Sequence, residues 1–183
     1  EKVINDQFHQ LRELVKDYIV TDVDENMQEV LGKILLQKKK TISTAESCTG
    51  GAIASLITSV PGSSSYFEGS VVSYSNNIKK SLLGVKEATL NQFGAVSEET
   101  VKEMLTGLLQ KMNTDYGIAV TGIMGPDGGT PDKPVGIVWL AVGNKNKQHT
   151  QKLKQRFARM KNIEVTATMA LNLMRKFILE DKF

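Results

Sequence analysis

Short segments with the character of β-strands alternate along this chain with longer segments that have the apolar period of an α-helix. Strands are predicted at 40–45, in the last part of 63–75, and at 116–120. Alternation of this kind is typical of α/β proteins, in which helices cover a sheet with parallel neighbours. The helices predicted between and after these strands cover 50–60, 76–84, 97–112 and 162–181.

Two further strands follow one another directly in the last third of the chain. Residues 137–143 and 148–157 have strand patterns, and Asn144, Lys145 and Asn146 between them favour a tight turn. Strands joined by a tight turn are antiparallel, so the sheet contains both kinds of pairing. We therefore expect a three-layer α/β/α sandwich with a mixed sheet that helices cover on both faces.

The first 25 residues differ from the rest of the chain. Residues 5–19 place their apolar side chains on one helix face, and a polar segment at 21–26 interrupts that pattern before a second amphipathic helix begins. We expect residues 1–25 to form a linker or docking helix, and residues 26–183 to form the compact domain.

Composition excludes several classes of protein. In the 183 residues, no apolar run approaches the roughly 20 residues that a membrane span needs. The single cysteine excludes an internal disulfide and fits a cytoplasmic protein. The net charge is +3, and no basic stripe is interleaved with aromatic residues, so nucleic-acid binding is not indicated. The basic run at 38–40 is interpreted as a solvated helix end.

The segment TAESCTGGAIASL, at 44–56, joins a predicted strand to a predicted helix and presents the first candidate for chemistry. Ser47 at a helix start is either a cap or a nucleophile. The unpaired N–H groups of a helix start suit an oxyanion, and Gly50 and Gly51 would let a substrate approach the backbone. Cys48 is a rival nucleophile, although lone cysteines are more often buried as small hydrophobes.

A serine nucleophile needs a base, and His9 and His149 lie in segments with no obvious relation to Ser47. A lysine or a carboxylate is therefore the expected base. Lys79 falls in the first turns of the helix that follows Tyr74, and a desolvated lysine there would accept a proton near neutrality. The alternative is a solvated surface lysine, and Lys80 would point about 100° away.

Metal and phosphate motifs are weak or absent. No cysteine and histidine spacing fits zinc. Asp127 and Asp132 could contact Mg²⁺, but isolated loop aspartates are more often turn residues. The segment 121–136 is rich in glycine and proline without a P-loop ending, so a ligand loop and ordinary turn chemistry both remain open.

Four segments together resemble the CinA C-terminal domain family, whose characterised members are nicotinamide-nucleotide amidases. They are TAESCTGG at 44–51, GSSSYFEGSVVSYSNNIKKSLLGV at 62–85, GAVSEETV at 94–101 and TGIMGPDGGTPDKPVGIVWLAV at 121–142. The resemblance covers about residues 26–180. It implies hydrolysis of nicotinamide mononucleotide to nicotinate mononucleotide and ammonia in pyridine nucleotide salvage, by an α/β/α fold that needs no cofactor and no metal.

The resemblance also implies roles for particular residues. Ser47 would be the nucleophile, Lys79 the base, and Tyr74 a group that positions Lys79 or relays a proton. Lys161 would stand where the family often has an arginine, with Arg159 at the place of a glycine. Met124 would replace a usually small residue of the pocket loop. The full set implied to bind substrate is Glu46, Thr49, Gly50, Gly51, Asn76, Thr121, Gly122, Gly125, Pro126, Gly129 and Lys161.

The resemblance further implies a homodimer and, in some members, an N-terminal partner domain to which residues 1–25 would connect. No membrane or nucleic-acid partner is expected. Two other functions stay open. One is a non-catalytic nucleotide-binding or partner-binding module of a competence/damage-inducible two-domain protein. The other is an amidase for a different pyridine carboxamide.

Overall fold

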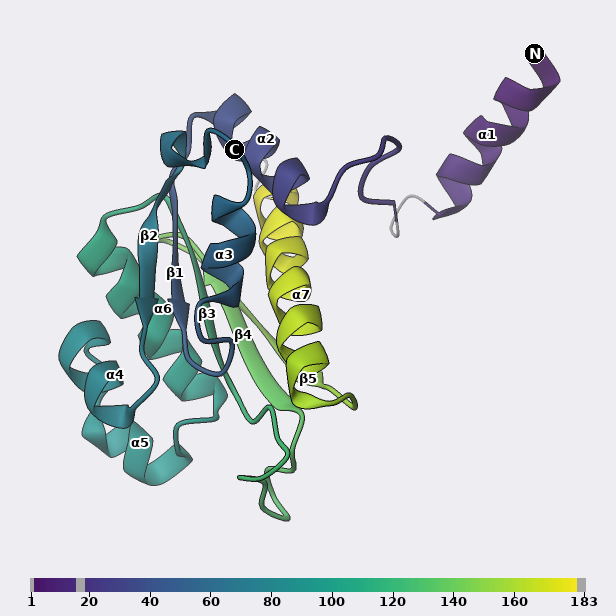
Figure 1. Ribbon diagram of the computed structural model, residues 1–183. Helices are drawn as coiled ribbons and strands as arrows, with labels where there is room; N and C mark the ends of the chain where they lie inside the picture. Colours follow the sequence, from purple (N-terminus) through teal and green to yellow (C-terminus); the bar gives the residue numbers. More distant parts are fainter. Residues whose placement is uncertain (1, 16–18, 181–183) are drawn as a thin grey trace.

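The computed structural model describes residues 2–15 and 19–180, and its centre is one five-stranded sheet with the order β2-β1-β3-β4-β5 (Figure 1). Strand β1 runs parallel to its neighbours β2 and β3, whereas β4 runs antiparallel to β3 and to β5. The sheet is therefore mixed, as predicted. The strands are β1 (Ile42–Glu46), β2 (Phe67–Val72), β3 (Tyr116–Gly122), β4 (Ile137–Gly143) and β5 (Gln148–Lys154).

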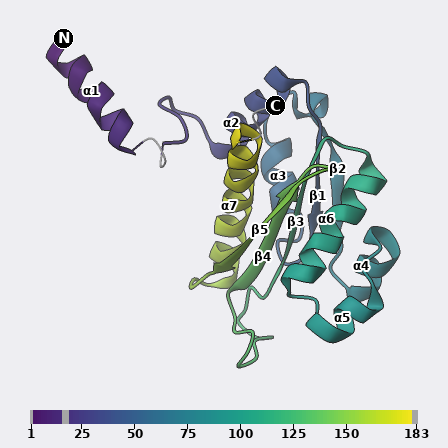
Figure 2. The ribbon, with the colours of Figure 1, turned by 180° about the vertical axis from the view of Figure 1, so that it is seen from behind.

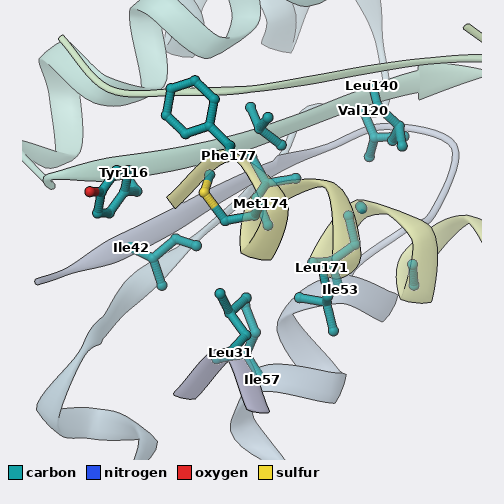
Figure 3. Close-up of a cluster of buried hydrophobic side chains, with 14 of the residues drawn as sticks. Leu31, Ile42, Ile53, Ile57, Tyr116, Val120, Leu140, Leu171, Met174 and Phe177 are labelled. Atoms are coloured by element: carbon teal, nitrogen blue, oxygen red, sulfur yellow. The ribbon is translucent and has the colours of Figure 1, made fainter. Parts of the chain in front are cut away.

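Three helices cover one face of the sheet: α2 (Met27–Lys38), α3 (Ala52–Thr58) and α7 (Arg159–Glu180) (Figure 1). Their apolar side chains meet those of the strands in the larger core of the molecule, which Figure 3 shows in close-up. The buried side chains of this core include Leu31, Ile42, Ile53, Ile57, Val120, Leu140, Leu171 and Met174.

The opposite face carries α4 (Asn76–Leu83), α5 (Glu87–Phe93) and α6 (Glu98–Met112), as Figure 2 shows. Helix α6 lies along the sheet and buries Val101, Met104, Leu105 and Leu108 beneath it. Helices on both faces confirm the three-layer α/β/α architecture expected from the sequence.

Helix α1 (Lys2–Val15) stands away from the sandwich in both ribbon views (Figures 1 and 2) and has no buried side chain. The helix predicted at 5–19 begins earlier in the structure, at Lys2, and it is described as far as Val15, whereas Ile19 is not helical. Tyr18, one of the apolar side chains of the helix predicted at 5–19, lies outside the described residues. In the described residues, none of the helices combines the length and hydropathy required to cross a bilayer.

The structure differs from the predicted helices in two other places. The helix predicted at 50–60 begins only at Ala52, because Gly50 and Gly51 have φ angles of 62° and 103° and form a turn before it. Helix α5 was not predicted from the sequence. It has seven residues, of which only Thr89 is buried, so it lacks a recognisable apolar stripe.

Candidate functional site

A pocket lies where the parallel strands β1, β2 and β3 end, because the loops that leave their carboxyl ends converge there. Crevices of this kind are the usual ligand sites of open α/β sheets. The pocket has a volume of about 270 Å³. It is lined by Ser47, Cys48, Tyr74, Asn76, Lys79, Ala95, Val96, Thr121, Gly122, Ile123, Met124, Asp127, Gly128 and Arg159.

The structure brings Ser47 and Lys79 into direct contact in this pocket. The two residues are 32 positions apart in the chain, yet 2.9 Å separates Lys79 Nζ from Ser47 Oγ. Lys79 Nζ also donates to the backbone carbonyls of Ser73, at 2.6 Å, and Tyr74, at 3.4 Å. The side chain of Lys79 is thus fixed by two acceptors with its terminal nitrogen against the serine hydroxyl.

Burial makes Lys79 a weaker base than an ordinary lysine. Its side chain is 1% exposed, and desolvation lowers its pKa from 10.5 to about 8. No ion pair joins Lys79 to a carboxylate anywhere in the described chain. With a pKa near 8, roughly a tenth of the amine is neutral at pH 7. A neutral amine in contact with a hydroxyl is a potential general base.

Ser47 is not the cap of helix α3, which corrects one of the two sequence interpretations. The N-cap position is Gly51, four residues later, and it makes no side-chain capping bond. Ser47 instead sits in the turn directly after β1, where its N–H donates to the carbonyl of Val120 at 3.1 Å. Ser47 lines the pocket, and its hydroxyl contacts Lys79 there.

The N-terminus of α3 is satisfied by Glu46. Its carboxylate accepts bonds from the N–H groups of Gly51, Ile53 and Ala54 at 2.8–3.0 Å and from the Thr49 hydroxyl at 2.7 Å. Glu46 is fully buried and does not line the pocket. The structure therefore gives no support to the expectation that Glu46 binds substrate, and its side chain instead holds the turn that carries Ser47.

Three of the backbone N–H groups in the turn at 47–51 already donate to other residues, so fewer N–H groups are left for the predicted oxyanion site. The N–H of Ser47 donates to Val120, that of Gly50 to the Ser47 carbonyl, and that of Gly51 to Glu46. Within residues 2–15 and 19–180, no hydrogen bond to another residue uses the N–H of Cys48 or Thr49. These two donors are the ones left to receive an oxyanion.

Cys48 behaves as a buried apolar residue. Its side chain is 6% exposed and belongs to the larger core. Burial raises the pKa of its thiol to about 12, so the thiol stays protonated near neutral pH. The structure therefore favours Ser47 over Cys48 as the nucleophile of this pocket.

Arg159, and not Lys161, reaches the pocket. Arg159 Nη1 donates to the Gly125 carbonyl at 2.8 Å, and Nη2 donates to the Tyr74 hydroxyl at 3.3 Å. Lys161 is exposed and pairs with Glu164 at 2.7 Å. Lys161 does not line the pocket, so the structure gives no support to its assignment to the substrate site, which stays a prediction. Positions two apart on a helix point about 200° away from each other, so this choice could have been questioned from the sequence.

Tyr74 contributes to the site in two separate ways. Its backbone carbonyl contacts Lys79, whereas its hydroxyl accepts from Arg159 and its side chain is 64% exposed. No hydrogen bond in the described residues joins the Tyr74 hydroxyl to Lys79. The geometry supports positioning of Lys79 by the Tyr74 backbone, and it does not support a proton relay through the phenol.

The glycine-rich loop is only partly a pocket wall. Thr121 and Gly122 line the pocket, as does Asn76 from α4. Gly125, Pro126 and Gly129 do not, and neither do Thr49, Gly50 and Gly51. A Cβ atom added at Gly125 would lie 2.6 Å from Val135, and one added at Gly129 would lie 2.8 Å from Val135. Both distances are too short, so only glycine lets these two positions pack this closely against Val135.

Some pocket residues were not chosen from the sequence. Ala95 and Val96 enter from the loop between α5 and α6, and the Thr121 hydroxyl donates to the Ala95 carbonyl at 2.8 Å. They lie in the segment at 94–101 that carries part of the family resemblance, which was the available signal. Met124 lines the pocket while its side chain is 2% exposed, packed into the core.

The pocket offers little for a metal ion. Asp127 lines it, whereas Asp132 does not. In the part of the chain that the structure describes, no three histidine, cysteine, aspartate or glutamate side chains cluster as metal ligands would. A reaction that needs neither metal nor cofactor stays a prediction.

Comparison with known proteins gives consistent matches. The model of the CinA C-terminal domain family matches residues 24–178. A CinA-like protein of Endomicrobium trichonymphae is 50% identical over 163 residues, which cover 89% of this chain and 38% of that relative. A CinA-like protein of Amoebophilus asiaticus is 41% identical over 96% of this chain and is covered to 42%. The chain thus spans less than half the length of these curated relatives.

Solved structures share the fold. A competence-damaged protein (CinA) superfamily protein from Klebsiella pneumoniae matches with a TM-score of 0.81 at 29% identity, over 85% of this chain and 99% of that one. The competence/damage inducible protein CihA from Agrobacterium tumefaciens matches with a TM-score of 0.78 at 34% identity, over 85% and 98% of the two chains. The family match at 24–178 includes every residue that lines the pocket.

Replacement of Glu46 by glutamine should destabilise the protein, because the amide group cannot accept from four donors at once. We expect Glu46→Gln to lower the free energy of unfolding by about 2 kcal/mol or more, measured by urea denaturation. Glu68→Gln is the matched control, because Glu68 is exposed on β2. Equal stabilities of the two variants would contradict the role assigned to Glu46.

Proposed function

This chain belongs to the CinA C-terminal domain family, and on that premise we propose that it hydrolyses the carboxamide of nicotinamide mononucleotide to nicotinate mononucleotide and ammonia. The observation that carries the proposal is the buried amine of Lys79 at 2.9 Å from Ser47 Oγ. Neither His9 nor His149 lines the pocket. A serine and lysine pair is therefore the nucleophile and base available there.

The first half of the reaction forms an acyl-enzyme. Neutral Lys79 donates its two N–H groups to the carbonyls of Ser73 and Tyr74, which directs the nitrogen lone pair at Ser47. Ser47 Oγ attacks the carboxamide carbon while its proton passes to Lys79. The carbonyl oxygen becomes an oxyanion that the N–H groups of Cys48 and Thr49 receive.

The second half releases the two products. Collapse of the tetrahedral intermediate breaks the bond between carbon and nitrogen, and the ammonium of Lys79 protonates the leaving nitrogen, so that ammonia departs. Water then attacks the ester of Ser47, with Lys79 again accepting a proton. The second tetrahedral intermediate expels Ser47 Oγ, which recovers its proton from Lys79, and leaves the carboxylic acid.

Arg159 is the group best placed to bind the substrate's phosphate. Its hydrogen bonds go to two uncharged acceptors, Gly125 O and the Tyr74 hydroxyl, so no carboxylate neutralises it in those contacts. A guanidinium offers paired donors that match phosphate oxygens. A lysine at position 161 therefore need not weaken phosphate binding, because Arg159 takes that role.

The remaining expectations belong to the same proposal. We propose that residues 26–183 form the amidase domain, that residues 1–25 connect it to another domain, and that the protein is a cytoplasmic homodimer. The exposure of α1 and the greater length of the curated relatives support the connecting role. Two observations would identify the alternatives. Binding of the nucleotide with no release of ammonia would indicate a binding module, and release of ammonia from a different pyridine carboxamide would indicate a different substrate.

Removal of either member of the pair should abolish turnover. We expect Ser47→Ala and Lys79→Met each to lower kcat about 10³-fold or more, because the two residues act as one unit. The measurement is ammonia release from nicotinamide mononucleotide by purified protein. Lys80→Met and Cys48→Ala are controls that should keep activity within a few-fold. Activity near that of the unmodified protein in either pair variant would remove that residue from the mechanism.

The rate should follow the protonation of Lys79. Because only the neutral amine accepts the serine proton, kcat/KM should fall tenfold for each pH unit below about 8 and level off above it. Initial rates of ammonia release between pH 6 and pH 10 measure this profile. A rate independent of pH between 6 and 8 would contradict a lysine base of lowered pKa.

Substitutions of Arg159 and of Lys161 can be compared to find which side chain binds the substrate's phosphate. Arg159→Met should raise KM for nicotinamide mononucleotide at least tenfold, because a charged hydrogen-bonded contact is worth about 1.5–3 kcal/mol. Lys161→Met should leave it unchanged. Turnover of nicotinamide, which lacks phosphate, should not respond to either substitution. A larger effect from Lys161→Met would restore the assignment made from the sequence.

A further inference from the structure

Asp127 is a charged residue of the pocket that the reaction described above does not use. It lies in the loop after β3 and lines the same pocket as Ser47 and Lys79. Of the described residues that line this pocket, Asp127 alone is acidic. Within the described chain its carboxylate makes no hydrogen bond and no ion pair, so it does not have the turn-capping role that is common for loop aspartates. The carboxylate is therefore free to contact a ligand.

Helix α7 anchors the loop directly before Asp127. The Met124 carbonyl accepts a hydrogen bond from Asn162 Nδ2 at 3.1 Å, and the Met124 side chain is buried in the core. The Gly125 carbonyl accepts from Arg159 Nη1 at 2.8 Å. Asp127 follows two residues later. Its position at the pocket is thus held by the anchored backbone, and its carboxylate is not occupied in holding it.

Opposite charges line the pocket without neutralising one another. Lys79 and Arg159 contribute an amine and a guanidinium, and Asp127 contributes the carboxylate. Arg159 donates to two uncharged acceptors, and among the described residues no ion pair joins it to Asp127. An anionic and a cationic group that share a pocket without pairing complement a ligand that itself carries both charges.

Nicotinamide mononucleotide is a ligand of this kind. Its phosphate is an anion, and its ring is a cation because the ring nitrogen is bonded to the ribose. The carboxamide that Ser47 attacks is attached to this ring, so the ring must enter a pocket of about 270 Å³ that already holds Lys79 and Arg159. Like charges repel at such short range. A carboxylate in the same wall offsets that repulsion.

We propose that Asp127 is a specificity-determining residue, whose carboxylate faces the cationic ring and makes the pocket prefer a carboxamide on a pyridinium to the same carboxamide on a neutral ring. This inference rests on the proposed function, because it takes the carboxamide nucleotide as the ligand. Arg159 binds the phosphate whatever the charge of the ring. Discrimination by ring charge is therefore the separate contribution of Asp127.

A magnesium ion is the competing ligand for this carboxylate. Mg²⁺ is commonly held by one or two carboxylates together with substrate phosphates. Asp132, the other aspartate of the loop, does not line the pocket, and no three metal-ligating side chains cluster in the part of the chain that the structure describes. The ring of the nucleotide is the better match, and a chelator separates the two possibilities.

The preference can be measured by calorimetric titration of Ser47→Ala protein, which binds the nucleotide without forming an acyl-enzyme. The two ligands are nicotinamide mononucleotide and its reduced form, which share the phosphate and carboxamide but differ in ring charge. In EDTA, adding Asp127→Asn should weaken binding of the oxidised form about fivefold or more. Binding of the reduced form should stay within about twofold, because its ring carries no charge.

The loop provides a matched control. Asp132→Asn removes the same charge from a residue of this loop that lies outside the pocket, so it should leave the affinity for both nucleotides unchanged. Asp127→Glu keeps the charge and should retain the preference for the oxidised form within about threefold. The thermal unfolding of each variant, compared with that of Ser47→Ala protein, reports that it is folded.

The outcomes separate this inference from the proposed function. If Ser47→Ala protein binds neither nucleotide up to about 1 mM, both are overturned. If Asp127→Asn changes neither affinity, or weakens both equally, only the role of Asp127 is overturned.

An equal effect of Asp132→Asn, or an effect of Asp127→Asn that appears only when Mg²⁺ replaces EDTA, would also overturn that role. Binding with the expected preference, but without ammonia release by the unmodified protein, would overturn the amidase reaction and support the role of Asp127.

Discussion

The burial of one lysine without a carboxylate partner is the constraint on which the rest of this structure depends. Lys79 is 1% exposed, and burying a charged ammonium is costly unless an anion compensates it. The surrounding chain supplies only carbonyl and hydroxyl oxygens within the described residues, from Ser73, Tyr74 and Ser47. These acceptors fix the position of the amine without stabilising its charge as a carboxylate would, so the proton is held weakly.

A carboxylate is in fact buried nearby, and the fold keeps it occupied. Glu46 precedes Ser47 directly and is fully buried, but helix α3 and Thr49 take its oxygens. The positive end of α3 thus compensates Glu46, and Lys79 is left without a counter-ion in the described chain. Within the described residues, the hydrogen bonds of Glu46 to α3 and Thr49 and those of Lys79 to Ser47, Ser73 and Tyr74 keep the two side chains in separate networks.

The open edge of the molecule has a different physical origin from the pocket. The pocket forms at the carboxyl ends of parallel strands, where loops converge and Arg159 donates hydrogen bonds to Tyr74 and Gly125. The edge exists because β5 is the last strand of an open sheet, so its outer backbone groups face away from the other strands. The pocket and the open edge therefore follow from two different features of one sheet, namely where its parallel strands end and where its strand order ends.

The sequence by itself determined the layered fold and the mixed sheet, because the apolar period of each element is written in consecutive residues. It also singled out Ser47 and Lys79 through the family resemblance, and the structure brings these two side chains into contact. It could not determine that Glu46 faces α3, nor that Arg159 rather than Lys161 turns to the pocket. Those orientations depend on where a turn ends and how a helix packs. Contacts between residues far apart in the chain decide both, so only the tertiary structure could place these side chains.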